Sequence, residues 1–198
     1  MSKEFLVTYA TKSGSTADVA GFIGQTLYDV GAKTVVKPVD LVKEIAEYEA
    51  VFIGSPIING KCMPEIKKFV SIHTPHLSEK TVAYFITCMR LSQVSGGTAH
   101  DIPVFVDPVF GNPRPKREMT FPEKVHPVTF YIKAILGMAN NLQPTSVAFF
   151  RGVLDYNTIG LLMTMLFKMM ARLDGLGPGD YRNWEAIRLW TENTYSRL

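Results

Sequence analysis

The feature of this sequence that most limits its fold is the regular alternation of short apolar runs with helical patterns. The apolar runs are rich in β-branched and aromatic residues and therefore predict strands. They cover residues 4–10, 34–39, 50–55, 81–88 and 147–154. Apolar residues at helical spacing predict helices over residues 17–30, 62–72, 128–140, 159–173 and 184–195. Strands that alternate with helices pair in parallel through right-handed crossovers, so we expect an α/β fold, a doubly wound five-stranded parallel sheet with helices on both faces.

Length and composition fit one domain, which we expect to span residues 1–198. Two cysteines, Cys62 and Cys88, make no disulfide framework, and the N-terminal apolar run is too short for a signal peptide or a membrane span. We therefore expect a reduced, cytoplasmic protein. The net charge is only +3, and Lys and Arg are spread along the chain without interleaved aromatic residues, which disfavours a nucleic-acid surface. Docking to anionic lipid or to an acidic small molecule stays possible.

One segment, residues 91–127, interrupts the alternation. It is rich in Pro, Gly and charged residues, so we expect an insertion loop after the fourth strand rather than a helix. A loop this long in a compact domain is usually a lid, a binding loop or a disordered segment.

A hydroxyl-rich turn follows the first strand, where a sheet of this kind places its ligand crevice. It consists of Thr11, Lys12, Ser13, Gly14, Ser15 and Thr16. The backbone N–H groups and the dipole at a helix N-terminus favour an anion, the hydroxyls can donate further hydrogen bonds, and the glycine lets the backbone come close. An ordinary N-cap needs only one hydroxyl, and this turn has four. The turn therefore predicts an anion site.

The type of anion follows from two missing patterns. A nucleoside triphosphate loop needs Gly, four residues and then Gly-Lys, and a dinucleotide site needs Gly-x-Gly-x-x-Gly after the first strand. Neither occurs here, and the glycine-rich stretch near residue 177 follows a predicted helix and is typical of a turn. A loop built from hydroxyls suits a phosphomonoester.

At this point the sequence resembles flavodoxins, whose phosphate loop has the pattern Thr/Ser-x-Thr/Ser-Gly-x-Thr. Thr11, Ser13, Gly14 and Thr16 match it. The resemblance implies FMN as the cofactor, a strand order of 2-1-3-4-5, and two further loops that hold the flavin ring. The residues of those loops are Ser55, Pro56, Ile57, Ile58, Asn59 and Gly60 after the third strand, and Thr87, Cys88, Met89 and Arg90 after the fourth.

The Asn59-Gly60 pair allows two interpretations. A peptide that contains glycine can flip at low cost and present its carbonyl to a protonated flavin N5, or the pair can be a routine turn that leads into the next helix. Neither of the two later loops carries a Tyr or Trp to stack on the ring. Phe105 and Phe110 of the insertion are candidates to cover it.

The C-terminal third resembles the flavodoxin-domain family of menaquinone-dependent protoporphyrinogen IX dehydrogenases. The likeness lies in Gly152 and Tyr156, a Met- and Leu-rich helix over residues 159–173, and Asp180 and Trp184. This chain departs from the family in a longer loop after the fourth strand and a shorter stretch before Trp184. The resemblance implies that FMN passes electrons from a reduced porphyrinogen to a quinone or another acceptor.

Several surface features allow a functional and a structural interpretation. Five basic residues can bind acidic groups of a substrate or form a solvated face, namely Lys61, Arg90, Arg114, Lys116 and Arg117. The Met-rich helix suits core packing or a homodimer interface, and also a peripheral membrane or quinone contact. Both cysteines are expected to be small buried apolar residues without a metal.

Three classes of function share this predicted fold. The first is a flavoenzyme with a small organic electron donor and a quinone acceptor, and the second is a flavodoxin that carries electrons between redox proteins. Such carriers are typically acidic, whereas this chain has a pI of about 8.8, which favours the enzyme. A phospho-receiver module is excluded because it needs acidic residues where this chain has Ala10, Thr11 and Ser55.

Overall fold

The computed structural model describes residues 4–91, 97–111, 127–139, 142–155 and 177–198. A mainly parallel sheet runs through it in the order β2-β1-β3-β5-β8-β7-β6. The strands of this path are β1 Glu4–Tyr9, β2 Lys33–Pro38, β3 Ala50–Ile58, β5 Thr81–Thr87, β6 Gly97–Ala99, β7 Ile102–Val106 and β8 Ser146–Phe150. The five predicted strands correspond to β1, β2, β3, β5 and β8, and their parallel pairing in the order 2-1-3-4-5 confirms the expected fold class.

The last predicted strand is shorter than expected. It ends at Phe150, and β9 (Val153–Leu154) leaves the main sheet to pair antiparallel with β10 (Gly179–Asp180). Gly152 marks the break, because a Cβ atom there would lie 2.8 Å from the Oγ atom of Ser15. The N–H of Val153 donates a hydrogen bond to that same hydroxyl at 3.1 Å. The chain thus leaves the sheet to contact the start of α1 (Ser15–Asp29).

The prediction that residues 91–127 form a loop is wrong for part of that segment. Strand β7 adds to the edge of β8 in parallel, and β6 returns antiparallel to β7. His100 and Asp101 join them with φ angles of 54° and 64°, a turn that suits a tight hairpin. Residues 92–96 and 112–126 lie outside the described part of the chain. Phe105 packs on Phe150 with ring centroids 5.9 Å apart, and Phe110 is buried. That these two residues cover a ligand stays a prediction.

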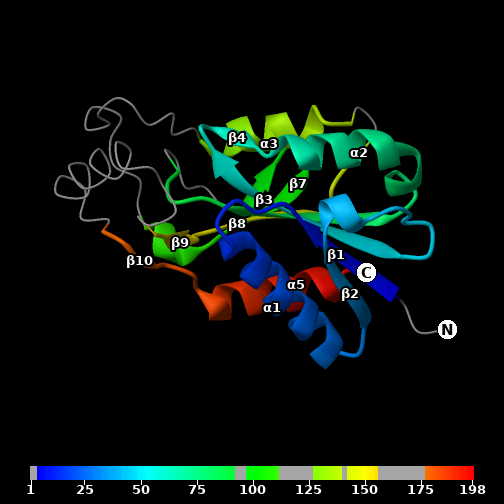
Figure 1. Ribbon diagram of the computed structural model, residues 1–198, viewed down its shortest axis with the longest axis horizontal. Helices are drawn as coiled ribbons and strands as arrows, with labels where there is room; N and C mark the ends of the chain where they lie inside the picture. The colour runs from blue at the N-terminus through cyan, green and yellow to red at the C-terminus, as the bar shows by residue number, and fades with distance from the viewer. Residues whose placement is uncertain (1–3, 92–96, 112–126, 140–141, 156–176) are drawn as a thin grey trace.

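Four described helices lie on the two faces of the sheet: α1, α2 (Pro64–Leu77), α3 (Val128–Leu136) and α5 (Trp184–Tyr195). Figure 1 shows α1 and α5 below the sheet and α2 and α3 above it. Helix α2 begins two residues later than predicted, because Lys61–Cys62 form the short strand β4 and Pro64 takes the first helical position. The helix predicted over residues 159–173 lies outside the described residues. Short 3₁₀ turns cover Val39–Leu41 and Pro108–Phe110.

The core below the sheet is built around Trp190 of α5. Its indole ring lies 5.6 Å from the ring of Phe150 and 5.8 Å from that of Phe52, both in edge contacts. The indole N–H donates to the Oγ atom of Ser146 at 2.8 Å, so the buried polar groups of both side chains are satisfied. Of the helices that the structure describes, each falls short of the length and apolar character that crossing a membrane requires.

Candidate functional site

The hydroxyl-rich turn connects β1 to α1 at the end of the sheet where its parallel strands finish (Figure 1). Gly14 is the residue before the helix and has a φ angle of 90°, a left-handed conformation that favours glycine. A Cβ atom at Gly14 would meet nothing within 4 Å, so its backbone lies beside open space. Gly14 has no side chain with which to cap the first turn of α1. The backbone N–H groups of that turn are therefore available to a bound anion.

Hydrogen bonds within the protein hold three of the four hydroxyls of this turn. Thr11 accepts a hydrogen bond on Oγ1 from the N–H of Gly14 at 3.0 Å. Thr16 is buried and pairs with the hydroxyl of Thr87 at 2.8 Å. Ser15 accepts the hydrogen bond from Val153. The hydroxyls of Thr11 and Ser15 act as acceptors in these bonds and so keep their own protons, which they can donate to an anion.

Lys12 and Ser13 are exposed at the tip of the turn. Together the six residues of the turn offer free backbone donors, oriented hydroxyls and one cationic side chain. This donor set fits a phosphate group.

The second predicted loop is a hairpin rather than a loop. Strand β3 continues to Ile58, three residues beyond the predicted end, and pairs antiparallel with β4. Asn59 and Gly60 form its two-residue turn with φ angles of 51° and 77°, as the Asn-Gly sequence favours. This geometry agrees with the interpretation of Asn59-Gly60 as a turn that leads into the next helix. The peptide flip toward a flavin stays a prediction.

The hydroxyl of Ser55 stabilises this hairpin through two hydrogen bonds. The side chain is buried, donates to the carbonyl of Pro56 and accepts from the N–H of Met63, both at 3.0 Å. It therefore ties the end of β3 to the start of α2. Pro56, Ile57 and Ile58 are half-buried along the hairpin.

The third predicted loop follows β5 and begins with buried residues. Thr87 bonds to Thr16, and the N–H of Cys88 donates to the carbonyl of Phe150 on the neighbouring strand at 2.9 Å. Burial raises the pKa of the Cys88 thiol to about 12, although the charge of Arg151 opposes this rise. Burial likewise raises the pKa of Cys62 to about 11, so both thiols are neutral at pH 7.

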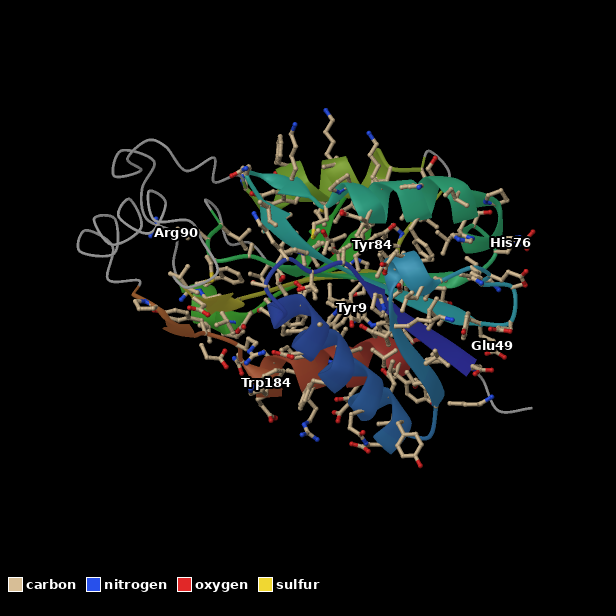
Figure 2. All side chains as sticks on the ribbon, viewed as in Figure 1. Tyr9, Glu49, His76, Tyr84, Arg90 and Trp184 are labelled. Atoms are coloured by element: carbon tan, nitrogen blue, oxygen red, sulfur yellow. The ribbon has the colours of Figure 1, made fainter. Side chains whose placement is uncertain are left out.

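Met89 and Arg90 continue the third loop in half-buried positions. Figure 2 shows Arg90 and Trp184 near the end where the strands finish, whereas Glu49 and His76 lie at the opposite end of the sheet. The turn of residues 11–16 therefore joins the third loop through the Thr16–Thr87 hydrogen bond, and the three predicted segments share one end of the sheet.

A polar cluster that the sequence did not reveal lies beside the third loop. Asp107 follows β7 and is completely buried, and its Oδ1 atom accepts from the N–H of Val109 and from Nδ2 of Asn183, both at 3.0 Å. Among the residues that the structure describes, its Oδ2 atom has no hydrogen-bond partner. Arg151 follows β8, and its Nε atom also has no partner in those residues. Unpartnered buried polar atoms are rare, so they mark this cluster as a candidate binding region.

The sequence indicates only one feature of this cluster, the capping role of Asp107. Asp107 before Pro108 is typical of an N-cap, and the side chain does cap the 3₁₀ turn at Pro108–Phe110. Nothing in the sequence indicates that Arg151 and Asn183 lie near it. Of the basic residues considered as substrate contacts, Lys61 is exposed, Arg90 is half-buried, and Arg114, Lys116 and Arg117 lie outside the described residues. Within the described ranges, no group of three or more His, Cys, Asp or Glu side chains is placed to hold a metal ion.

A doubly wound parallel sheet of this order is typical of flavodoxin-like α/β proteins, which place a ligand crevice at the carboxyl ends of the strands. The sequence model of the flavodoxin domain family matches residues 6–178, and the chain belongs to that family. No curated protein matches the chain in a sequence search.

Two solved flavodoxins show the same fold at low sequence identity. Oxidised flavodoxin 2 from Bacillus cereus is 15% identical, with a TM-score of 0.51 over 98% of this chain and 99% of that one. A flavodoxin from Streptococcus pneumoniae TIGR4 is 10% identical, with a TM-score of 0.50 over 98% and 99% of the two chains. A flavoprotein from Lactobacillus acidophilus NCFM, solved in complex with FMN, is 16% identical, with a TM-score of 0.45 over 75% and 93%.

Proposed function

We propose that this flavodoxin-domain protein binds FMN and uses it to transfer electrons. The observation that carries the proposal is the turn of residues 11–16, whose free backbone donors and oriented hydroxyls fit a phosphate at the N-terminus of α1. Membership of the flavodoxin domain family supports FMN as the cofactor.

The residues of the chain have separate roles in this proposal. Thr11, Ser13, Ser15 and Thr16 donate hydrogen bonds to the phosphate, while Gly14 gives the phosphate access to the backbone and Lys12 adds a positive charge. The hairpin from Ser55 to Gly60 and the segment from Thr87 to Arg90 hold the ring system. The bound flavin supplies the redox chemistry, and the protein supplies its position and its electrostatic surroundings.

Within this function we favour an oxidoreductase over a simple electron carrier. The net charge of +3 supports an enzyme with an acidic organic substrate, because carriers that dock on basic partners are typically acidic. The resemblance of the C-terminal third makes a porphyrinogen the first electron donor to test and a quinone the first acceptor. Electron transfer to a redox protein is the alternative.

The experiment is anaerobic stopped-flow spectroscopy on the purified protein reconstituted with FMN. Flavin absorbance is followed after mixing with protoporphyrinogen, NADH or NADPH, and then with a quinone. Rapid bleaching by one donor and recovery with quinone support the enzyme. Reduction by a protein partner or dithionite alone contradicts the enzyme and supports the carrier.

Three further expectations join this proposal. We propose that residues 1–198 act as a single domain, that the protein acts in the cytoplasm with peripheral contact to a membrane that supplies the quinone, and that two copies can form a homodimer. Light scattering and sedimentation with anionic vesicles test the last two of these.

A further inference from the structure

Arg151 lies at the end of β8, beside the predicted flavin segment that follows β5. The preceding residue, Phe150, accepts a hydrogen bond from the N–H of Cys88, so the two chain segments run side by side at this point. The Arg151 guanidinium lies over the rings of Phe110 and Tyr181, 5.3 Å and 5.8 Å from their centroids. Contact with two aromatic rings fixes the orientation of the planar guanidinium but does not neutralise its positive charge.

The carboxylates that the structure describes form no ion pair with Arg151. Asp107 attracts the guanidinium, yet these two described residues form no ion pair within 4.0 Å. The Oδ1 atom of Asp107 instead binds Val109 and Asn183. Burial lowers the pKa of Arg151, and the nearby charge of Arg90 lowers it further, while Asp107 raises it. A half-buried cation whose Nε atom has no hydrogen-bond partner among the described residues favours the binding of an anion nearby.

We propose that Arg151 is a positioning cation that stabilises the negative charge of the bound flavin after two-electron reduction. This inference rests on the proposed binding of FMN. In the reduction, the ring takes two electrons and one proton from the reductant. The proton forms the N5–H bond, N1 stays unprotonated, and the ring gains one negative charge. The guanidinium neither gains nor loses a proton.

This role has a consequence for the type of protein. A cation beside the ring makes two-electron reduction easier, because it favours the reduced anion over the neutral oxidised ring. An acidic surface would have the opposite effect. Arg151 therefore suits a protein that exchanges two electrons with an organic molecule.

The test is the two-electron midpoint potential of the FMN-loaded protein, measured by dithionite titration against redox dyes. In Arg151→Gln we expect the preference of the protein for reduced over oxidised FMN to fall about tenfold, the order of one charge interaction at a partly exposed site. A tenfold change corresponds to about 30 mV for a two-electron couple. Arg151→Lys keeps the charge and should keep most of the potential.

Arg182→Gln is the matched control. Arg182 also lies over an aromatic ring, that of Trp184 at 4.6 Å, but its charge is paired with Asp18 and Asp180, each at 2.6 Å. We expect this variant to leave the flavin potential unchanged.

A second measurement, the slope of the potential with pH, needs no variant. We expect the wild-type protein to take up one proton per two electrons near neutral pH, and Arg151→Gln to move toward two. Uptake of two protons by the wild type, or an unchanged potential in Arg151→Gln with FMN bound, would overturn the inference. Failure of the wild type to bind FMN would instead overturn the proposed function.

Discussion

The turn of residues 11–16 and the cluster of Asp107 and Arg151 lie at the same end of the sheet but are built in different ways. The turn is local: six consecutive residues form it, one hydrogen bond from Gly14 to Thr11 closes it, and two more join it to Thr87 at the end of β5 and to Val153 at the start of β9. The cluster comes from residues 44 positions apart, and it leaves one oxygen of Asp107 and Nε of Arg151 without partners. In the proposed function, the turn holds the phosphate of the flavin, whereas Arg151 of the cluster acts on the charge of the flavin ring.

Removal of two hydroxyls from the turn should have the largest effect on FMN binding. In Thr11→Ala combined with Thr16→Ala, each lost hydrogen bond to the phosphate costs about 1.5–3 kcal/mol. The dissociation constant of FMN should therefore rise by roughly 10²–10⁴, measured by flavin fluorescence in a titration. Thr74→Ala in α2 removes only a hydroxyl bonded to its own helix and serves as the control. Unchanged FMN affinity in the double variant would refute the phosphate assignment.

A substitution in the cluster should instead change the stability of the fold. In Asp107→Ala, the N–H of Val109 and the amide of Asn183 lose a buried charged acceptor, so we expect the free energy of unfolding of the apoprotein to fall by about 2 kcal/mol. Asp107→Asn keeps an oxygen at the Oδ1 position and should cost less. Urea denaturation measures both. Equal stability of Asp107→Ala and the wild type would show that the cluster does not hold β7 to the start of α5.

A pair of glycine variants tests whether the backbone of the turn is preformed. Gly14 has a left-handed φ angle, so Gly14→Ala should lower the free energy of unfolding by about 1–2 kcal/mol although the added methyl group meets nothing. Gly21 lies inside α1 and also has open space around it, so Gly21→Ala should raise stability by about 0.5–1 kcal/mol. Thermal unfolding of the apoprotein compares the two. Effects of the same sign would contradict the assigned backbone of the turn.

The smallest effect is expected at Arg182, which joins α1 to β10 through partly exposed ion pairs. Arg182→Gln should cost no more than about 1 kcal/mol, and less at high salt. Arg182 holds the pKa of Asp180 below its ordinary value of 3.8 in the folded protein. The pair therefore stabilises the fold above pH 3.8, and this contribution is lost as the pH falls through the lower folded pKa. The difference in urea midpoint between the variant and the wild type should be smaller at pH 3 than at pH 7, and a constant difference would contradict this linkage.

The sequence predicts the parallel sheet and the anion turn because both depend on local patterns. Apolar runs with β-branched residues form β1, β2, β3, β5 and β8. Thr11 and Ser13 precede α1 as expected, whereas Ser15 and Thr16 belong to its first turn, because the helix begins two residues earlier than predicted. The tasks of individual side chains were not predictable. Ser55 ties β3 to α2, and Thr16 bonds to Thr87, which is 71 positions away. Such contacts arise when distant strands meet, and the sequence carries no local signal for them.

The strands within residues 91–127 are not evident from the sequence for a related reason. Its Pro, Gly and charged residues hid the short apolar run that becomes β7. That run becomes a strand because the edge of β8 offers it backbone partners. Arg151 is the residue directly after β8, so the end of that strand determines its position.

The proposed phosphate site can be tested by comparing the binding of FMN with that of riboflavin, which has the same ring system without the phosphate. If the turn of residues 11–16 holds the phosphate, isothermal titration should show FMN binding at least about 10²-fold more tightly than riboflavin, the loss expected when about two charge-assisted hydrogen bonds disappear. The double variant Thr11→Ala with Thr16→Ala should narrow this difference. Equal affinity of the wild-type protein for the two flavins would contradict the account.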